Sequence, residues 1–498
     1  MTGLVMRSIV PRLHPDPARV IARLFLPGEE HPATRSRTSQ VVDRVMALTE
    51  IEVEQLATKL VDDFAGRHHD YEQLLARHAS IVGAHVGETP ELSKARELLL
   101  GATFTAEYAT EAAALCNPSA VSHPDQTGVP SGATRVAISL RGIGEGHISS
   151  IAFCSAILGP GESFTFEPRD LPVSAGEVTT ARWRRAHLRA VLGDLDGIDE
   201  LGQAVLRSLP TRFDSVDLEA ALAGVHHDLL ARPGALGTVQ LLRSLVGSAY
   251  QVDFDERTSL PQRVLMPSAA EESNGMEDAR FTRFVEDDGS VDYRATYTAY
   301  DGRRIAPRLL TSPDLRTFAT HRLAGPAARN KGMALFPRRV GRRYLALCRS
   351  DGESTSLASS PDGVVWSQPI LLQHPIASWE LLQIGNCGPP IETDRGWLVL
   401  THGVGAMRTY SIGAILLDLD DPAQVIGRLE QPLLVPDAET RDGYVPNVVY
   451  SCGALVHDGL LWLPYGIDDA RIGVAWVPVS DLLTALLPAD RRRPAGSR

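Results

Sequence analysis

The chain has 498 residues, which is too long for one ordinary domain and indicates two or three folding units. Hydrophobic residues make up 44% of it and charged residues 22%, a composition typical of a soluble globular protein. The net charge of −12 excludes a global basic field that would attract nucleic acid or anionic lipid, so an anionic ligand requires a local basic pocket.

Five cysteines stand singly, without a C-x-x-C pair, which argues against a disulfide framework and against a zinc knuckle. We therefore predict reduced thiols packed in a core. Residues 1–26 lack a continuous apolar stretch followed by a cleavage site. No run approaches the roughly 20 apolar residues that span a bilayer. We expect a cytoplasmic protein that binds neither a membrane nor nucleic acid.

The first part of the chain changes from an irregular pattern to a helical one. Residues 1–38 are rich in Pro and Arg. Beyond them, Thr49 and Glu52 have the spacing of a capping box and precede an apolar stripe with a 3.6-residue period, formed by Val53, Leu56, Leu60, Val61 and Phe64. A second helical pattern covers about 180–250. Neither block carries a catalytic motif, so we expect both to pack over the rim of the remaining fold and either to help build an oligomer or to form a wall of the acceptor site.

The segments outside the helical blocks have the pattern of short strands. Residues 134–140 alternate like a strand, continue into a glycine-rich turn and resume as a strand over 148–158. From about residue 251 to 482, strands and turns follow one another. The sequence therefore predicts a mainly β protein.

A turn phrase recurs in the second of these β segments. The phrase T-S-P-D ends at Asp314 and is followed by Phe318, and S-S-P-D ends at Asp362 and is followed by Trp366. The copies are 48 residues apart, and such a period with several short strands per unit is typical of a propeller blade. One blade cannot bury both of its faces alone and must stack on its neighbours. We therefore expect polar residues from several blades to meet at the mouth of a central axis.

These patterns divide the chain into six segments. They are an irregular leader (1–38), an N-terminal helical region (39–116), a first propeller blade (117–179), a helical insertion (180–250), the remaining blades (251–482) and a disordered basic tail (483–498). The insertion thus separates the first blade from the rest of the propeller.

The run R-G-I-G-E-G-H at 141–147 follows a strand and resembles a phosphate-binding glycine loop. It fits neither G-x-x-x-x-G-K-[ST] nor G-x-G-x-x-G, and the residues after it predict a strand instead of the helix that such a loop requires. A turn between strands is the better interpretation, with Arg141, Glu145 and His147 facing a ligand in a polar pocket.

Several motifs are weak alone, since an isolated E-D-x-R is more often a surface salt bridge, but they gain meaning from their order. They are N-P at Asn117, E-D-x-R at 277–280, N-K-x-x-x-L-F-P from Asn330, I-G-x-x-x-P-P-I from Ile384, G-W-L-x-x-x-H-G-V from Gly396, G-Y-x-x-N-V-V from Gly443 and Y-G-x-x-D from Tyr465. In this order they resemble glycoside hydrolase family 130, the β-mannoside phosphorylase and β-mannosidase family of five-bladed propellers. The resemblance covers about residues 117–482 without the helical insertion.

The resemblance implies a catalytic acid and a phosphate pocket. It makes Asp278 the general acid, acting through a substrate hydroxyl, in place of the usual pair of carboxylates. It makes Lys331, Arg349 and His402 the basic residues that hold phosphate beside the sugar. Inorganic phosphate is then a co-substrate, and neither a metal nor an organic cofactor is required.

The resemblance also implies a sugar site. Asp469 matches the aspartate that binds hydroxyls of the mannosyl ring, and we expect Asn117, Arg141 and Tyr465 beside it. With Glu145 and His147, these residues form the predicted substrate-binding set. The expected partners are a small oligosaccharide, phosphate and further copies of the chain in a homo-oligomer.

Gln383 departs from the pattern, because phosphorylases that resemble this chain carry lysine there. It lies 19 residues before His402, a spacing similar to that of the family's phosphate-pocket lysine and histidine. A charge-assisted contact is worth roughly 1.5–3 kcal/mol, so the change weakens dianion binding. We expect reversible, inverting phosphorolysis of β-mannosides to mannose 1-phosphate. The alternatives are hydrolysis, with Glu353 or Glu380 as base, mannosyl transfer, and a non-catalytic glycan-binding propeller.

Overall fold

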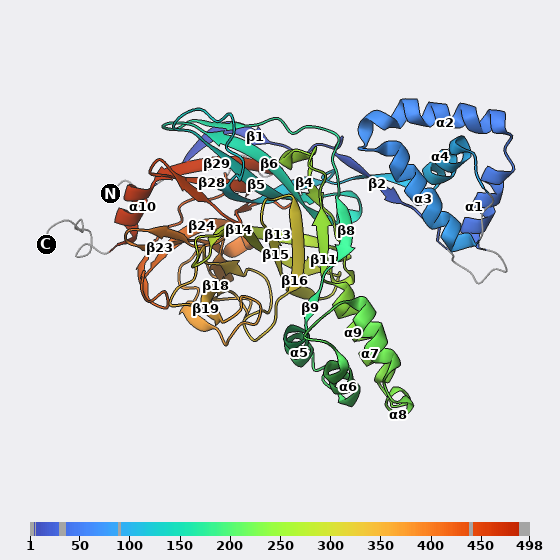
Figure 1. Cartoon of the computed structure of the whole chain (residues 1–498). Coiled ribbons are helices and arrows are strands. Elements are labelled where there is room, and N and C mark those ends of the chain that lie inside the picture. Colours follow the sequence, from blue (N-terminus) through green and yellow to red (C-terminus); the bar gives the residue numbers. More distant parts are fainter. Residues whose placement is uncertain (1–3, 5, 29–35, 88–90, 438–441, 488–498) are drawn as a thin grey trace.

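The computed structural model describes residues 4, 6–28, 36–87, 91–437 and 442–487 (Figure 1). Antiparallel sheets form the body of the molecule, and two groups of helices project from it. The mainly β class, with an N-terminal helical region and a helical insertion, is confirmed. No described helix is long and apolar enough to cross a lipid bilayer.

Strand pairing gives four sheets of four or more strands among the described residues, and the largest of them is joined in its middle by a single parallel pair, Ser149 with Gly275. We divide this sheet at that pair, which gives five strand sets in the body. The first set comprises β4 (Ala114–Ser122), β5 (Thr134–Ile143), β6 (Ser149–Leu158) and β7 (Phe164–Phe166), and the second comprises β13 (Gly275–Val285), β14 (Val291–Tyr300), β15 (Ile305–Ser312) and β16 (Thr317–Arg322). The third set comprises β17 (Ala334–Leu335), β18 (Tyr344–Cys348), β19 (Thr355–Ser360) and β20 (Ile370–Gln373), and the fourth comprises β21 (Gln383–Asn386), β22 (Ile391–Thr393), β23 (Gly396–Val404), β24 (Tyr410–Leu417) and β25 (Val425–Arg428). The fifth set comprises β26 (Val449–Tyr450), β27 (Leu455–His457), β28 (Leu460–Ile467), β29 (Arg471–Pro478) and, from the other end of the chain, β1 (Arg7–Leu13). The short strand β12 (Val264–Leu265) pairs with β6.

Buried apolar clusters lie between neighbouring sets and hold them together. Phe153 packs with Phe281 between the first and second sets, and Trp397 packs with Phe336 between the third and fourth. The cluster of Trp462 joins the fifth set to the first, which closes the ring. The body is therefore a β-propeller, and we interpret each strand set as one blade.

The recurring turn phrase occupies the same place in the second and third sets. In each set it follows the third strand, and a serine hydroxyl closes the turn. Ser312 Oγ accepts the N–H of Leu315 at 2.8 Å, and Ser360 Oγ accepts the N–H of Gly363 at 2.9 Å. The aromatic residues that end the two phrases are buried. The 48-residue period thus marks equivalent turns in successive blades.

The predicted irregular leader contains two strands, so this prediction is wrong for residues 7–13 and 20–24. β1 pairs with β29 and completes the fifth set, and Met6 is buried beside it. β2 (Val20–Leu24) pairs with β3 (Thr105–Ala109). Between them, Arg19 Nε forms a fully buried ion pair with Glu111 Oε1 at 2.7 Å. Residues 7–13 are thus part of the propeller body.

The N-terminal helical region comprises α1 (Arg37–Met46), α2 (Glu50–Phe64), α3 (Tyr71–Val86) and α4 (Lys94–Thr103). The capping box of Thr49 and Glu52 is present at the start of α2. Of the predicted apolar stripe, Val53 is buried and Leu56 is largely exposed. The helical region ends at Thr103, earlier than the predicted residue 116, because the residues that follow form β3 and the buried strand β4.

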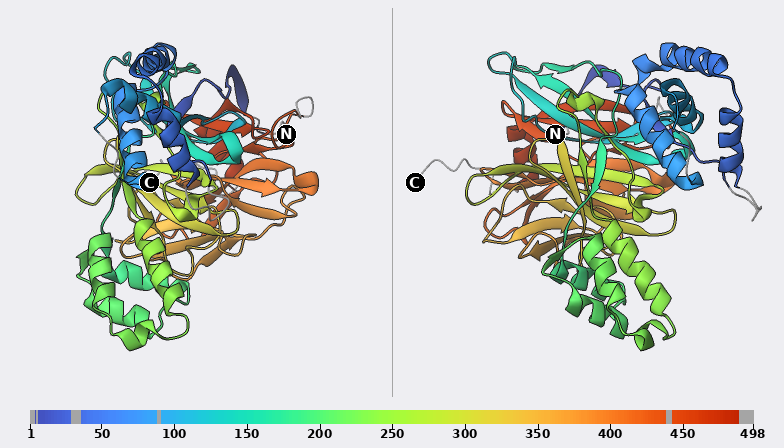
Figure 2. Two further views of the ribbon diagram at one scale, coloured as in Figure 1. Left: turned by 90° about the vertical axis from the view of Figure 1, so that its right-hand side faces the viewer. Right: turned by 45° about the vertical axis from the view of Figure 1, so that its right-hand side comes forward.

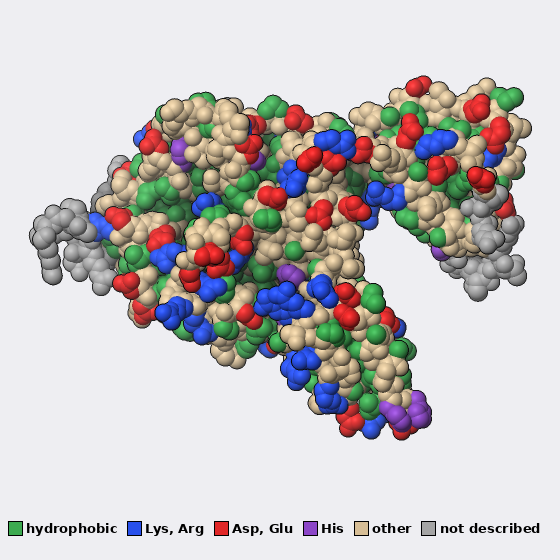
Figure 3. Space-filling view, viewed as in Figure 1, with side chains coloured by type: hydrophobic (Ala, Val, Ile, Leu, Met, Phe, Trp, Pro, Cys, Tyr) green, Lys and Arg blue, Asp and Glu red, His purple; other side chains and the backbone are tan. Residues whose placement is uncertain are grey.

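The helical insertion comprises α5 (Arg185–Asp194), α6 (Glu200–Ser208), α7 (Ser215–Ala223), α8 (His227–Leu230) and α9 (Ala235–Gly247), with a short pair of β9 (Trp183–Arg184) and β10 (Arg212–Phe213). The chain leaves the propeller through β8 (Glu177–Thr180) and returns through β11 (Tyr250–Asp253), which pair side by side next to β16. Both helical groups project outward and do not lie flat over the propeller (Figure 2). Acidic and basic side chains are interspersed on them (Figure 3).

The C-terminal segment is helical where the sequence predicts a disordered tail from residue 483. Helix α10 (Val479–Leu486) buries Leu482, Leu483 and Leu486 against the fourth and fifth sets. An apolar face of this kind has to be covered, which accounts for the ordered segment. The predicted tail over 488–498 lies outside the described residues. All five cysteines are buried and unpaired, as predicted.

Because β1 closes the edge of the fifth set, we expect removal of residues 1–14 to lower the Tm by about 5 °C or more in a thermal melt. The matched control is Arg7→Ala, which keeps the strand but removes an exposed ion pair with Glu162 and the contact of the guanidinium with the Trp476 ring, and it is expected to lower the Tm by about 2 °C at most. An unchanged Tm for the shortened chain contradicts a structural role of β1.

Candidate functional site

The first strands of neighbouring sets adjoin, with β4 against β13 and β13 against β17. Left-handed backbone conformations occur in or next to four of these first strands, at Asn117 (φ 50°), Asp278 (φ 56°), Asn330 (φ 62°) and Asn447 (φ 65°). Such values are uncommon outside glycine and collect at functional positions. At Asn117 and Asp278 the pairing register also shifts. Such irregularities re-aim side chains, and here they bring these two into contact.

Asp278, the predicted general acid, is buried among donors. Its Oδ1 accepts hydrogen bonds from Asn117 Nδ2 at 2.5 Å and Arg141 Nη1 at 3.2 Å. Arg280 Nη1 donates to the Asp278 carbonyl oxygen at 2.8 Å. Burial alone raises the pKa of the carboxyl, but Arg141, Arg280 and Lys331 outweigh it and lower this pKa to about 2. Asp278 is therefore ionised in the ligand-free protein.

Glu277 links two of the predicted ligand-binding residues. Its Oε1 accepts from Arg141 Nη2 at 2.7 Å, and its Oε2 accepts from Lys331 Nζ at 2.5 Å. Sequence reasoning assigned Glu277 no role, although it belongs to the E-D-x-R motif. The Lys331 side chain is 36% exposed, so a ligand can reach its ammonium group. Through Glu277 the structure brings Arg141 and Lys331 to the side of Asp278.

Arg349 and His402 form a second part of the site. Arg349 Nη1 donates to His402 Nε2 at 3.3 Å, which places the imidazole proton on Nδ1. Burial and then Arg349 lower the pKa of His402 well below its ordinary value, so the ring is neutral at pH 7. The resemblance counts His402 among basic residues. In the ligand-free protein it is a neutral hydrogen-bonding group, and Arg349 supplies the charge.

Arg349 is a cation whose charge is not balanced by any described residue. Within the described part of the chain, no carboxylate lies within ion-pair distance of its guanidinium, and its buried Nε has no hydrogen-bond partner. Gly385 keeps this region open, since a Cβ there would lie 2.7 Å from His402 Cε1 and 3.3 Å from Arg349 Cδ. Gln383 is two residues away on β21 and points to the same side as position 385. Because the Gln383 side chain is a neutral amide, Arg349 is the charged group in this second part of the site.

Arg280 and Tyr450 join the two parts of the site. Arg280 is fully buried, and its Nε donates to the Cys387 carbonyl at 2.9 Å and its Nη2 to the Tyr450 hydroxyl at 2.8 Å. The Tyr450 ring packs edge-on against His402, with centroids 4.9 Å apart. Sequence reasoning missed both residues, although Tyr450 directly follows the N-V-V motif. One buried network thus positions the Asp278 backbone and the imidazole.

Asp469 lies in the turn after β28, where Asp468 and Asp469 are both left-handed. Burial raises the pKa of Asp469 to about 6, despite the nearby Arg141. Among the described residues, Asp469 Oδ1 and Asn117 Oδ1 are buried acceptors without a donor. Buried polar atoms are normally paired, so these two oxygens are open to ligand hydroxyls.

The remaining predicted substrate-binding residues lie in other surroundings. Glu145 and His147 are exposed on the short 3-10 helix η2 (Glu145–His147), where His147 Nδ1 is 2.9 Å from the Tyr444 hydroxyl. Tyr465 is buried in the apolar cluster between the fourth and fifth sets, with its hydroxyl 3.4 Å from Ser8 Oγ. The structure therefore places Tyr465 in the packing against β1 and leaves His147 accessible at the rim.

The two glutamates considered as hydrolytic bases differ in their surroundings. Glu380 is fully buried, forms an ion pair with Arg428, and accepts the N–H groups of Ile376 and Ala377, each at 3.1 Å. Through these contacts the Glu380 carboxylate holds the loop that contains Ile376 and Ala377. Glu353 is exposed, and its carbonyl oxygen accepts the N–H of Ile384 at 2.9 Å. Glu380 is therefore occupied by protein partners, and Glu353 is open to solvent.

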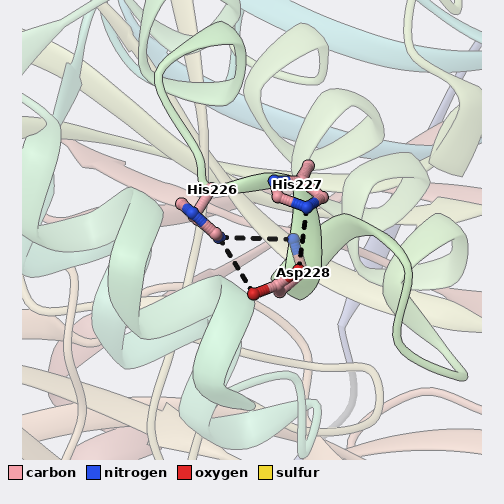
Figure 4. Close-up of side chains that lie close together, drawn as sticks. All are labelled: His226, His227 and Asp228. Atoms are coloured by element: carbon pink, nitrogen blue, oxygen red, sulfur yellow. Dashed lines mark hydrogen bonds and ion pairs between the residues drawn. The ribbon is translucent and has the colours of Figure 1, made fainter.

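One described cluster has the spacing of a metal site, and it lies far along the helical insertion (Figure 4). His226 Nδ1 is 3.4 Å and His227 Nε2 is 2.9 Å from oxygens of Asp228. All three side chains are exposed at α8, at the outer end of the insertion (Figure 1). Nothing connects this cluster to Asp278.

We expect Asp469→Asn to raise the Tm relative to the wild type by an amount that grows between pH 4 and pH 7. The folded-state pKa of Asp469 is raised, so its contribution to stability is present at low pH and is lost as the pH rises to about 6. Asparagine does not ionise and escapes this loss. Thermal melts at each pH measure the difference. The exposed Asp394→Asn is the control, and a difference independent of pH contradicts the assignment.

Comparison with known proteins gives matches over the second half of the chain. The family model described as beta-1,4-mannooligosaccharide phosphorylase matches residues 239–487, half of the chain. A 1,2-beta-oligomannan phosphorylase of Thermoanaerobacter sp. (strain X514) is 34% identical over 247 residues, which cover 48% of this chain and 80% of that protein. A beta-1,2-mannobiose phosphorylase of the same organism is 34% identical over 238 residues, covering 47% and 76%.

A third relative has a solved structure. The beta-1,2-mannobiose phosphorylase of Listeria innocua is 29% identical over 261 residues, covering 51% of this chain and 69% of that protein. The structure of its β-1,2-mannobiose complex aligns with a TM-score of 0.44 over 76% of this chain and 93% of that one. The family match over half of the chain, together with relatives of which it covers about three quarters or more, establishes that the chain belongs to glycoside hydrolase family 130.

Proposed function

We propose that the chain is a phosphorylase that cleaves β-mannosides reversibly, with inversion, and releases mannose 1-phosphate. The observation that carries this proposal is the uncompensated guanidinium of Arg349 beside His402 and Gln383. A cation without a counter-ion in a half-buried site favours an anionic ligand, and guanidinium groups bind phosphate through charge-assisted hydrogen bonds. Lys331 supplies a second accessible cation. The mannoside phosphorylase relatives are consistent with this assignment.

In this proposal, phosphate binding prepares Asp278 to act as the acid. The carboxyl is ionised in the free protein because Arg141, Arg280 and Lys331 surround it. A bound dianion neutralises part of that positive charge and raises the pKa of Asp278, so the carboxyl takes up the proton that the leaving group requires. A phosphate oxygen then attacks the anomeric carbon from the opposite face. The cations hold this nucleophile in position, which replaces the second carboxylate of an inverting hydrolase.

The sugar ring is held beside the acid by acceptors that have no protein donor. Asp469 Oδ1 and Asn117 Oδ1 are placed to accept mannosyl hydroxyl protons. Asn117 also binds Asp278 through its amide nitrogen, so the residue that contacts the sugar also orients the acid. Hydrolysis is not favoured as a second function, because Glu380 is occupied by Arg428 and by two backbone N–H groups.

The direct test is a screen of β-1,2-, β-1,3- and β-1,4-linked mannobioses with and without phosphate. We expect mannose 1-phosphate only when phosphate is present, and disaccharide synthesis from mannose 1-phosphate and mannose. Asp278→Asn is the inactive control, with a rate reduced about 100-fold or more and a nearly unchanged Tm. Free mannose released at an equal rate without phosphate contradicts phosphorolysis.

We expect Lys331→Ala to raise the KM for phosphate about tenfold or more while the KM for the mannoside changes less than about threefold, because in the proposed complex the ammonium group, held by Glu277, binds the dianion and not the sugar. Gln383→Lys is expected to lower the phosphate KM. Lys94→Ala, at an exposed lysine on α4, is the control for loss of charge. Equal effects on both KM values exclude Lys331 from the phosphate site.

Tyr450 is expected to act by positioning, and two variants separate its contacts. Tyr450→Phe keeps the ring against His402 but removes the hydroxyl that accepts from Arg280. We expect kcat to fall about tenfold with little change in the phosphate KM. Tyr450→Leu also removes the ring from His402 and is expected to raise the phosphate KM. If both variants lower kcat equally and leave KM unchanged, the proposed division between the two contacts is wrong.

A further inference from the structure

Helix α5 lies nearer the propeller than α6 and α8, and it contacts the start of the link between β16 and β17 (residues 323–333; Figure 1). His187 Nε2 donates to the Arg322 carbonyl oxygen at 2.7 Å, and Asp194 Oδ2 accepts the N–H of Gly325 at 2.5 Å. Between these two contacts, Ala324 is fully buried in the apolar cluster of the insertion. The insertion therefore holds the first residues of the link between the second and third strand sets.

Gly325 approaches the third strand set too closely for any other residue. Its φ is 97°, and a Cβ there would lie 2.1 Å from the Trp366 carbonyl oxygen. The Trp366 N–H donates to the Ala324 carbonyl at 2.8 Å, which fixes the link in this position. Gly325 is buried, and among the described residues Asp194 is the acceptor of its N–H. A buried N–H requires a partner, so loss of this carboxylate is expected to shift the link.

The same link carries Lys331, six residues after Gly325. The Ala328 N–H donates to the Gly325 carbonyl at 2.9 Å, which closes a turn. Side chains on both sides of Lys331 lie in one buried cluster, which contains Leu323, Ala327, Ala328 and Met333. A closely packed segment transmits a displacement instead of absorbing it. A shift at Gly325 therefore reaches Lys331, whose Nζ lies 2.5 Å from Glu277 Oε2.

We propose that Asp194 is a positioning residue for Lys331, so that the helical insertion contributes to the affinity for phosphate. The inference rests on the proposed phosphorolysis and extends it, because it connects the insertion to the anion site. Asp194 acts through the N–H of Gly325 and contacts neither the sugar nor the phosphate. A merely structural role would lower stability without distinguishing phosphate from the mannoside.

The kinetic test uses two variants of Asp194. We expect Asp194→Ala to raise the KM for phosphate about fivefold, while kcat and the KM for the mannoside change less than about twofold. Asp194→Asn keeps an oxygen that accepts the N–H of Gly325, so it is expected to keep both KM values within about twofold of the wild type. Glu219→Ala, which removes an exposed ion pair with Arg243 in the same insertion, is the matched control with unchanged KM values.

A double-mutant cycle with Lys331→Ala tests whether Asp194 acts through the lysine. In the Lys331→Ala background, we expect Asp194→Ala to change the phosphate KM less than about twofold, because the group that it positions is absent. A further fivefold rise in that background overturns the inference. An unchanged phosphate KM in Asp194→Ala alone also overturns it, as does an equal rise of both KM values with a Tm lowered by about 10 °C or more.

Hydrogen exchange of residues 323–333 and calorimetric titration with phosphate separate this inference from the proposed reaction, since neither requires turnover. We expect the segment to exchange about tenfold faster in Asp194→Ala and at the wild-type rate in Asp194→Asn. Absence of turnover with every β-mannoside contradicts phosphorolysis, whereas faster exchange together with about fivefold weaker phosphate binding in Asp194→Ala still supports the positioning role. Unchanged exchange, or faster exchange with unchanged phosphate binding, overturns it.

Discussion

The site depends on the interactions that keep Glu277 and Asp278 ionised in the interior. A buried carboxylate without a partner costs several kcal/mol, so two adjacent ones need cations held in good geometry. Arg141 of the first blade contacts both, at 2.7 Å and 3.2 Å. Since the carboxylates lie on β13, separating the first and second blades leaves Arg141 without its partners and takes from Glu277 and Asp278 the cation that they share. The contact that joins these blades is therefore also the contact that positions the proposed acid.

The same charges determine what the site can bind. Arg141 and Lys331 are largely neutralised by Glu277 and Asp278, and His402 is neutral because it is buried beside Arg349. The positive charge left over is concentrated on Arg349. In the proposed function the chain needs no overall basic character to hold phosphate, since one local cation without a counter-ion among the described residues is sufficient to place the anion. The net charge of −12 and the anion site are thus compatible.

The fold class was predictable because the turns between its strands are determined by residues that lie close together in the sequence. The turn at Asp314 and the turn at Asp362 are closed by hydrogen bonds within a few residues, so a short phrase predicts them. The strand β1 was not predictable, because its partner β29 lies more than 450 residues away and its own sequence contains a proline. Strands that depend on distant partners carry little local signal.

In the candidate site, too, features set by nearby residues were predictable and features set by distant contacts were not. The motif order identified Asp278, Lys331, Arg349 and His402, which the structure brings into two connected parts. The neutral state of His402 and the burial of Tyr465 depend on what packs around them, and neither can be read from residue types. Tyr450 was missed because a tyrosine after a buried strand is usually a core residue. Its hydroxyl acquires a role only through Arg280, which lies 170 residues earlier in the chain.

Gln383 illustrates how the cations and the acid constrain each other. A lysine at this position adds a charge beside Arg349 and strengthens the binding of a dianion. The same charge stabilises the ionised form of Asp278 and lowers a pKa that three cations already hold near 2. An acid that binds its proton less readily protonates the leaving group less often. In the proposed reaction, a neutral amide at Gln383 therefore weakens phosphate binding but favours protonation of Asp278, so glutamine at this position is a compromise between the two steps that the cations are proposed to serve.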